Sequence, residues 1–125
     1  MTEHAEVEMV RDCDPVRLPS SATVMAAARA MHSRGASAVL VIEGEATLVG
    51  IFTERDAISR VLAQGQHPVA TTLAEVMTDN PETATTEHGA DEVVRRMQAA
   101  HCRHLPLVDG GKLVGMVSRG RFRIS

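Results

Sequence analysis

Aromatic residues are almost absent from this 125-residue chain, which has no tryptophan, no tyrosine and two phenylalanines. Its core must therefore be built from aliphatic side chains and methionine, and aromatic stacking cannot be the main means of holding a flat ligand. The two cysteines have no spacing typical of a disulfide framework or a zinc knuckle, so we expect a reduced, cytoplasmic setting. An apolar run such as Ala38 to Ile42 is far too short to span a bilayer.

A strong charge of either sign is also lacking, because the formal net charge is −3. We therefore expect neither nucleic acid nor a membrane as a partner. The acidic excess lies in residues 1–75, whereas arginines near the C-terminus give residues 76–125 a small positive excess. The first ten residues are acidic, which is not typical of a secretory signal peptide.

The chain contains an internal duplication, which has to be recognised before a fold is proposed. Residues 50–56 read GIFTERD, and residues 115–121 repeat this as GMVSRGR. Upstream of these segments, identical residues recur at a spacing of 66, as at Val10 and Val76 or Met31 and Met97. We divide the chain into a tail (1–9), a first repeat (10–65), a linker (66–75) and a second repeat (76–125).

Both repeats predict the order strand, helix, strand, strand, helix. The first has an extended segment at 15–18, a helix capped among Ser20, Ser21 and Thr23 with apolar Val24, Ala27, Ala28 and Met31, strands at 38–42 and 48–52, and a helix after Thr53 with apolar Ala57, Ile58, Val61 and Leu62. The second has an extended segment at 82–84, a helix from about Ala90, strands at 105–108 and 113–117, and a final helix that has barely begun at Ser125.

A repeat of roughly 50 residues buries too little surface to be stable alone. We therefore predict an α+β fold of tandem βαββα repeats with pseudo-twofold symmetry, whose sheets pack face to face around a shared core.

These segments together resemble a CBS-domain pair, also called a Bateman module. The resemblance covers residues 10–125 and is carried by GIFTERD, by VMTDNP at residues 76–81 and by RHLPLVD at residues 103–109. It implies a regulatory module that binds an adenosine-containing ligand, such as AMP, ADP, ATP or S-adenosylmethionine, in a cleft between the repeats. It also implies a flat homodimer of two such pairs.

Thr53 and Asp56 are the first candidate site. Their spacing predicts a capping box, in which Asp56 also favours the positive end of the helix dipole. A strand-to-helix turn also offers backbone N–H groups to an anion, and a carboxylate can accept hydrogen bonds from ribose hydroxyls. The resemblance gives Thr53 the phosphate or ribose and Asp56 the ribose, so we predict ligand binding in addition to capping.

Ser118 and Arg121 are the matching positions of the second repeat. Arg121 cannot accept hydrogen bonds from ribose hydroxyls, because a guanidinium group is only a donor. The second cleft is therefore either empty or binds a different group such as phosphate. A solvated arginine on a frayed terminal turn is the alternative.

Arg103 and His104 stand where the second repeat enters its first long strand. The resemblance assigns them to the phosphates of a nucleotide, and the alternative is a surface arginine beside a packed histidine. The expected apolar walls of the first cleft are Val16, Leu18, Ala38, Leu40 and Ile51, each of which could equally be a plain core residue.

A metal site at His101, Cys102 and His104 is disfavoured, because three ligands within four residues do not match tetrahedral zinc spacing. No P-loop, HExxH or nucleophile–base motif is present, so we expect no enzymatic activity and no required cofactor. The alternative to ligand sensing is a dimerising interaction module that binds another protein and no small molecule.

Overall fold

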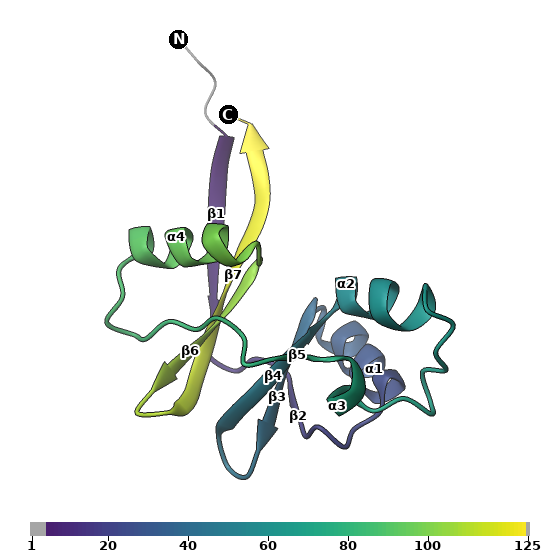
Figure 1. The fold of residues 1–125 in the computed structure, drawn as a ribbon. Helices are drawn as coiled ribbons and strands as arrows, with labels where there is room; N and C mark the ends of the chain where they lie inside the picture. Colours follow the sequence, from purple (N-terminus) through teal and green to yellow (C-terminus); the bar gives the residue numbers. More distant parts are fainter. Residues whose placement is uncertain (1–4, 125) are drawn as a thin grey trace.

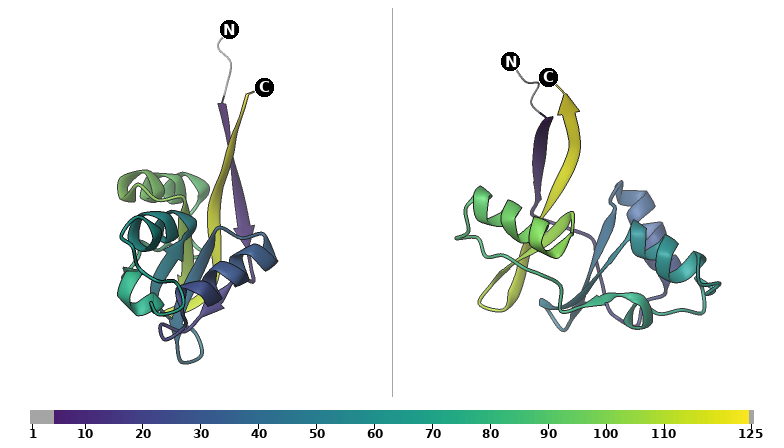
Figure 2. Two further views of the ribbon diagram at one scale, coloured as in Figure 1. Left: turned by 90° about the vertical axis from the view of Figure 1, so that its right-hand side faces the viewer. Right: turned by 45° about the horizontal axis from the view of Figure 1, so that its top comes forward.

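The computed structural model describes the backbone of residues 5–124 and the side chains of residues 9–119. It confirms the predicted α+β architecture of two repeats, which lie side by side with their sheets toward each other (Figure 1, Figure 2). Among the described helices, none is long and apolar enough to cross a membrane.

The helices and strands follow the predicted order as far as the last strand, with additions at the start of each repeat, although the extended segment predicted at 82–84 forms only an isolated bridge between Ala84 and Leu107. The first repeat comprises β1 (Ala5–Asp12), β2 (Arg17–Leu18), α1 (Val24–Arg34), β3 (Ala38–Glu43), β4 (Thr47–Thr53), α2 (Glu54–Asp56) and the π-helix η1 (Ala57–Leu62). The second comprises α3 (Leu73–Val76), β5 (Thr78–Asp79), α4 (Ala90–Ala100), β6 (His104–Asp109) and β7 (Lys112–Ile124).

Each repeat is built on an antiparallel pair, β3 with β4 and β6 with β7. β2 runs parallel to β3, β5 pairs with β4, and β1 pairs with β7. The two sheets meet at the pair of Thr47 and Lys112, where the Leu113 N–H also donates to the Ala46 carbonyl at 2.9 Å. The repeats therefore form one continuous sheet that is held together by few backbone bonds at this junction.

The duplication is visible in the close approach of backbone at two glycines. A Cβ added at Gly115 would lie 3.0 Å from the Asp12 carbonyl oxygen, and one at Gly50 would lie 3.0 Å from the Thr78 carbonyl oxygen. Asp12 and Thr78 are themselves separated by the 66-residue spacing of the repeats. The backbone of β1 thus lies against Gly115 and that of β5 against Gly50, and the absence of a side chain at each glycine permits the contact.

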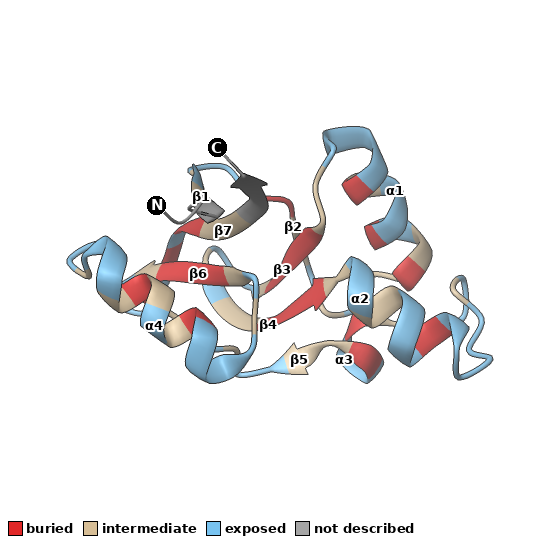
Figure 3. Cartoon of the chain, turned by 90° about the horizontal axis from the view of Figure 1, so that it is seen from above, coloured by how far each residue is buried: buried red, intermediate tan, exposed pale blue. Residues whose placement is uncertain are grey.

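Three apolar clusters form the core (Figure 3). One lies between the first sheet and its helices and includes Val39, Val41, Phe52 and Val61. A second lies between α4 and the second sheet and includes Val93, Met97, Leu105 and Leu107. The third joins the repeats through Ala38, Leu40, Ile51, Leu113 and Met116, which confirms the predicted shared core.

The expected final helix is wrong, because β7 continues as a strand to Ile124 and pairs with β1. A capping box cannot form there, since Arg121 occupies the position of Asp56 and a guanidinium group accepts no hydrogen bond from a backbone N–H. Residues 5–12, predicted as a tail and the start of a repeat, provide a neighbouring strand for this segment instead. The side chain of Arg121 lies outside the described residues.

The helix after Thr53 covers the sheet with a narrower face than predicted. Val61 is fully buried and Ala57 packs against the first core, as expected. Ile58 and Leu62 were predicted on the same face, but their side chains are 62% and 63% exposed. Ile58 and Leu62 directly follow Ala57 and Val61 in the sequence, so their side chains lie beside the packed face of the helix. There they form an apolar stripe on the surface.

Candidate ligand site between the repeats

The turn from β4 to α2 forms the predicted capping box. Thr53 has extended backbone angles (φ −116°, ψ 168°), and its Oγ1 accepts a hydrogen bond from the Asp56 N–H at 3.2 Å. In return, Asp56 Oδ2 accepts from the Thr53 N–H at 2.9 Å and from the Thr53 hydroxyl at 3.1 Å. The capping role of both residues is therefore confirmed.

The other oxygen of the Asp56 carboxylate, Oδ1, makes a weaker contact. Oδ1 lies 3.6 Å from Nε of Arg60, longer than a good hydrogen bond, and the Asp56 side chain is only 13% exposed. Oδ1 can therefore accept a hydrogen bond from a bound hydroxyl group. The Thr53 hydroxyl already donates to Asp56, so it can donate to a ligand only by breaking that bond.

His104 connects the two repeats beside this turn. Its Nε2 lies 3.1 Å from Oγ of Ser37 in the first repeat, and its Nδ1 lies 2.8 Å from Oγ of Ser118 in β7. Burial lowers the pKa of His104, and the neighbouring Arg103 guanidinium lowers it further. We call the chain of Ser37, His104 and Ser118 the histidine bridge.

Backbone contacts fix the histidine bridge next to the capping box. The Ser37 carbonyl accepts from the Glu54 N–H at 3.0 Å, and Thr53 pairs with Ala38 across the β3–β4 hairpin. The equivalent bond of the second repeat runs from the Arg119 N–H to the Arg103 carbonyl at 2.9 Å. Of the predicted site residues, Thr53, Asp56, His104 and Ser118 are thus brought together, with the Arg103 backbone beside them.

The predicted apolar walls divide between two faces of the first sheet. Ala38, Leu40 and Ile51 lie in the cluster that joins the repeats and are almost completely buried. Val16 and Leu18 instead pack in the core beneath the helices, so their expected place in the cleft wall is corrected.

Strand alternation explains this correction and identifies Arg17 as a residue that the sequence analysis missed. Successive residues of a strand point to opposite faces, so Arg17, between Val16 and Leu18, shares the face of its partner Leu40 toward the other repeat. Its Nε is buried and has no hydrogen-bond partner among the described residues. A buried donor without an acceptor is uncommon, and a ligand oxygen would satisfy it.

Ser37 is the second residue that the sequence analysis missed. It is an unremarkable serine in the loop before β3, and only the fold brings it to His104, 67 positions later in the chain. The one available indication was the alignment of the repeats, which places Ser37 opposite Arg103.

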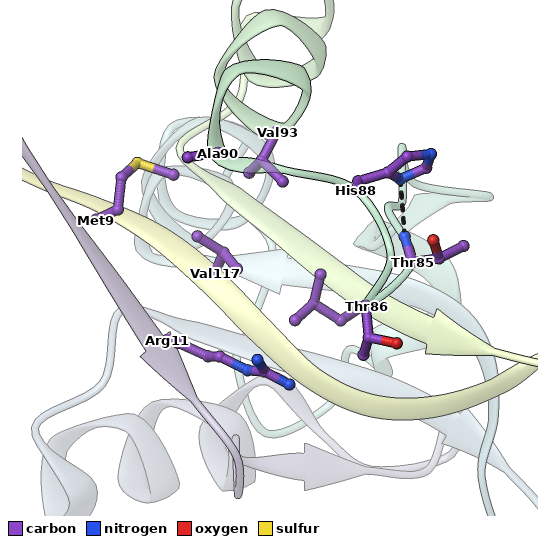
Figure 4. A pocket seen from close by; sticks show the side chains of 9 residues that line it. Met9, Arg11, Thr85, Thr86, His88, Ala90, Val93 and Val117 are labelled. Atoms are coloured by element: carbon purple, nitrogen blue, oxygen red, sulfur yellow. Dashed lines mark hydrogen bonds between the residues drawn. The ribbon is translucent and has the colours of Figure 1, made fainter.

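Two of the cavities on the described surface lie away from this site, since neither is lined by Thr53, Asp56 or His104. A cavity of about 270 Å³ lies between α4, β1 and β7 (Figure 4). Its lining residues are Met9, Arg11, Thr85, Thr86, His88, Ala90, Val93, Leu107 and Val117. A more polar cavity of about 530 Å³ lies between η1 and α3.

The first cavity follows from the missing final helix. In the first repeat η1 covers the sheet and buries Val61, whereas in the second repeat Met9 of β1 packs there in part. The apolar floor at Val93, Leu107 and Val117 is consequently left open. This cavity is therefore a gap in the second core and lies apart from the site between the repeats.

The three residues considered for a metal lie on different elements. His101 ends α4, Cys102 packs against the second core, and His104 belongs to the histidine bridge. Within the described part of the chain, no group of three His, Cys, Asp or Glu side chains is placed to hold a metal ion.

Comparisons with known proteins agree with this architecture. The CBS domain family model matches the chain twice, at residues 5–63 and 73–123. The CBS domain-containing protein CBSCBSPB3 of Arabidopsis thaliana is 34% identical over 111 residues, which are 89% of this chain and 20% of that protein. An uncharacterized protein of Methanopyrus kandleri, MK0525, is 31% identical over 97 residues, covering 77% of this chain and 50% of that protein.

Solved structures show the same fold. A putative signal-transduction protein with CBS domains from Burkholderia ambifaria has a TM-score of 0.80 at 33% identity, covering 86% of this chain and 78% of that one. The CBS domain pair of protein MJ0100, solved with 5′-methylthioadenosine and S-adenosyl-L-methionine, has a TM-score of 0.78 at 28% identity, covering 86% and 87%. The chain spans about a fifth of the length of CBSCBSPB3 and its four CBSCBSPB relatives. It belongs to the CBS-domain family.

Proposed function

We propose that this CBS pair is a non-enzymatic regulatory module that binds an adenosine-containing ligand in the cleft between its repeats. The observation that carries the proposal is that Ser37 links the capping box to the histidine bridge, because its carbonyl accepts from the Glu54 N–H and its side chain is hydrogen-bonded to His104. This link supports a single ligand site that uses the Asp56 carboxylate of the first repeat together with His104 and Ser118 of the second. The binding of 5′-methylthioadenosine and S-adenosyl-L-methionine by the MJ0100 pair supports an adenosine ligand.

The roles of the side chains follow from their chemistry. Asp56 Oδ1 would accept hydrogen bonds from the ribose hydroxyls, and Ser118 with His104 would bind the group attached to the 5′ carbon. Ile51, which is 7% exposed in the apolar cluster between the repeats, would contact the adenine, because Leu40 is fully buried. Aromatic stacking is not expected, since tryptophan and tyrosine are absent from the sequence and Phe52 is buried in the first core. No cofactor is required for this function, and the ligand itself is the regulatory signal.

Isothermal titration calorimetry with AMP, ATP and S-adenosylmethionine tests the proposal. Replacing Asp56→Ala removes the ribose acceptor, and we expect the affinity to fall at least tenfold, because an unpaired ribose hydroxyl loses a charge-assisted hydrogen bond. Asp91→Ala is the matched control, since Asp91 is an exposed carboxylate in the first turn of α4. Equal affinity in the wild type and Asp56→Ala would exclude Asp56 from the site.

Loss of the cap must be separated from loss of the ligand. Without its capping box, α2 should be destabilised by about 1 kcal/mol, so the folded fraction of Asp56→Ala is first measured by urea unfolding. A thermal-shift screen then supplies a second measure, since a ligand at 100 times its Kd stabilises the wild type by about 2.7 kcal/mol. No shift with any adenosine compound would refute ligand sensing.

Self-association is a second function that one observation favours. Ile58 and Leu62 are large apolar side chains that are mostly exposed, and neighbouring exposed apolar side chains can mark an interaction surface. A second copy of the chain is the occupant we propose, because a twofold axis would bring identical stripes together. The hexameric CBS-CP12 protein from cyanobacteria, 26% identical, shows that a protein of this fold can assemble.

Sedimentation equilibrium tests this surface. We expect Leu62→Lys to shift a dimer toward monomer, whereas Val114→Lys on the outer face of β7 serves as the control. If the wild type is monomeric at all accessible concentrations, the stripe is not a dimer interface.

A further inference from the structure

The number of serine hydroxyl groups in the histidine bridge that can donate to a ligand depends on the protonation state of His104. A neutral imidazole has one N–H donor and one acceptor nitrogen. One of its two serine partners must therefore donate its hydroxyl proton to the ring, and only the other serine can donate elsewhere. The contacts of 3.1 Å to Ser37 and 2.8 Å to Ser118 are short enough for both bonds to form.

A protonated imidazole changes this count. Both ring nitrogens then donate, so the oxygens of Ser37 and Ser118 both act as acceptors. Their hydroxyl protons are released from the ring and can both point to a third group. Protonation thus converts the bridge from a single hydroxyl donor into two hydroxyl donors that flank a positive charge, an arrangement suited to an anion.

The surroundings of His104 favour the neutral form of the ring when no anion is present. It is partly buried, and the charged groups on the elements around it are Arg103 before it, Arg119 in β7, and Glu54 and Asp56 in α2. Asp56 is already engaged by its capping box. Burial and the Arg103 charge both lower the pKa of His104, and a negative charge that binds beside the ring would favour the protonated form again.

We propose that an adenosine ligand with an anionic group binds together with one proton, which His104 takes up as the ligand enters. This inference rests on the proposed function. It makes the cleft responsive to pH, because binding of the anionic ligand becomes tighter as the pH falls, by up to about tenfold per unit. It also favours phosphorylated ligands over neutral adenosine or cationic S-adenosylmethionine.

Proton uptake of this kind is expected at one site of the chain. The repeat alignment places Ala38 opposite His104 and Ser37 opposite Arg103, so the first repeat has no histidine at this position. A site built from the equivalent residues of the first repeat therefore cannot bind an anion with proton uptake at this position. At most one proton per chain should accompany the ligand.

Calorimetry in two buffers of different ionisation enthalpy measures the proton directly. AMP and adenosine are titrated near neutral pH into the wild type, into His104→Gln and into His32→Gln. Glutamine keeps a donor and an acceptor between the serines but does not titrate, and His32 is an exposed histidine of α1. Comparison of variants cancels any proton exchanged by the AMP phosphate itself.

We expect the wild type and His32→Gln to take up a fraction of a proton with AMP that His104→Gln does not take up. With adenosine, none of the three should show this difference. If AMP binds but all three proteins take up the same number of protons, the inference is overturned and the proposed function stands. If neither ligand binds, the proposed function fails and the inference with it.

An NMR titration gives a second readout that is independent of nucleotide binding. The imidazole signals of His104 are followed against pH with and without sulfate, an anion that does not titrate in this range. We expect sulfate to raise the pKa of His104 and Ser37→Ala to reduce the rise, whereas Ser33→Ala on α1 should not. An unchanged pKa in saturating sulfate would contradict the proposal.

Discussion

Helices α1 and α4 end on equivalent residues in the same left-handed conformation, which allows the duplication to be tested at a single position. Gly35 ends α1 with φ 62° and ψ 32°, and His101 ends α4 with φ 54° and ψ 39°. In both, the N–H of this residue bonds to carbonyls of the last helical turn. Glycine adopts this left-handed conformation without steric cost, whereas histidine does not.

His101→Gly should therefore stabilise the protein. Relief of the left-handed conformation contributes roughly 1–2 kcal/mol, and the greater freedom of glycine in the unfolded chain removes about 0.5–1 kcal/mol. The expected net gain is about 0.5–1 kcal/mol, or roughly 3 °C in Tm. Gly35→His should produce the opposite change, because a Cβ at Gly35 meets nothing within 4 Å and only the backbone strain would be introduced.

Urea unfolding of both variants provides the measurement. His32→Gly is the control, since glycine within the last turn of α1 should destabilise by about 1 kcal/mol and shows that glycine is not stabilising in general. A loss of stability in His101→Gly would refute the reasoning, because it would mean that the imidazole makes a contact worth more than the strain. No change in Gly35→His would refute the assigned cost of the conformation.

Three further outcomes can be measured by the same unfolding assay. Val117→Phe should fill part of the 270 Å³ cavity with the residue type found at the equivalent Phe52 and stabilise by about 1 kcal/mol, whereas a destabilised variant would show that the cavity cannot accept the ring. Gly115→Ala should destabilise by roughly 1–3 kcal/mol, because its Cβ would lie 3.0 Å from the Asp12 carbonyl oxygen, and a neutral effect would mean that β1 shifts freely. As the pH falls from about 7.5 to about 5.5, the free energy of unfolding of the wild type should fall more than that of His104→Gln. The reason is that the pKa of His104 is lowered in the folded protein, so the unfolded chain binds the proton first. Parallel pH profiles of the two proteins would contradict this.

Local chemistry made much of the fold predictable from sequence. Thr53 and Asp56 stand three residues apart at a strand end, and their capping box needs no distant partner. The hairpin at Gly110 and Gly111 likewise depends on glycines that accept positive φ, here 56° and 81°. Features of this kind are specified within a few residues, so the pattern alone identifies them.

The failures concern contacts between distant segments. Arg121 in place of Asp56 removes the local signal for a helix after Ser118, but it does not show that these residues remain extended, because that depends on β1, which lies alongside them and is more than 100 residues away in the chain. The assignment of Val16 and Leu18 to the cleft failed for a different reason. Their apolar character fits either face of a strand, and only the pairing of Arg17 with Leu40 shows which face meets the other repeat.

The capping box and the histidine bridge bear on how a ligand could alter this molecule. The Thr53 hydroxyl donates to Asp56, and the Ser37 oxygen is hydrogen-bonded to His104 of the other repeat. A ligand that takes a hydrogen bond from the Thr53 hydroxyl must therefore replace a bond within the first repeat. A ligand that takes one from the Ser37 hydroxyl replaces a bond between the repeats when that hydroxyl donates to the His104 ring. Only a ligand that interacts differently with the two arrangements can shift the balance between them. An anion that enters with a proton on His104 keeps the bond between the repeats, with His104 as its donor, so we expect such a ligand to hold the repeats together rather than to part them.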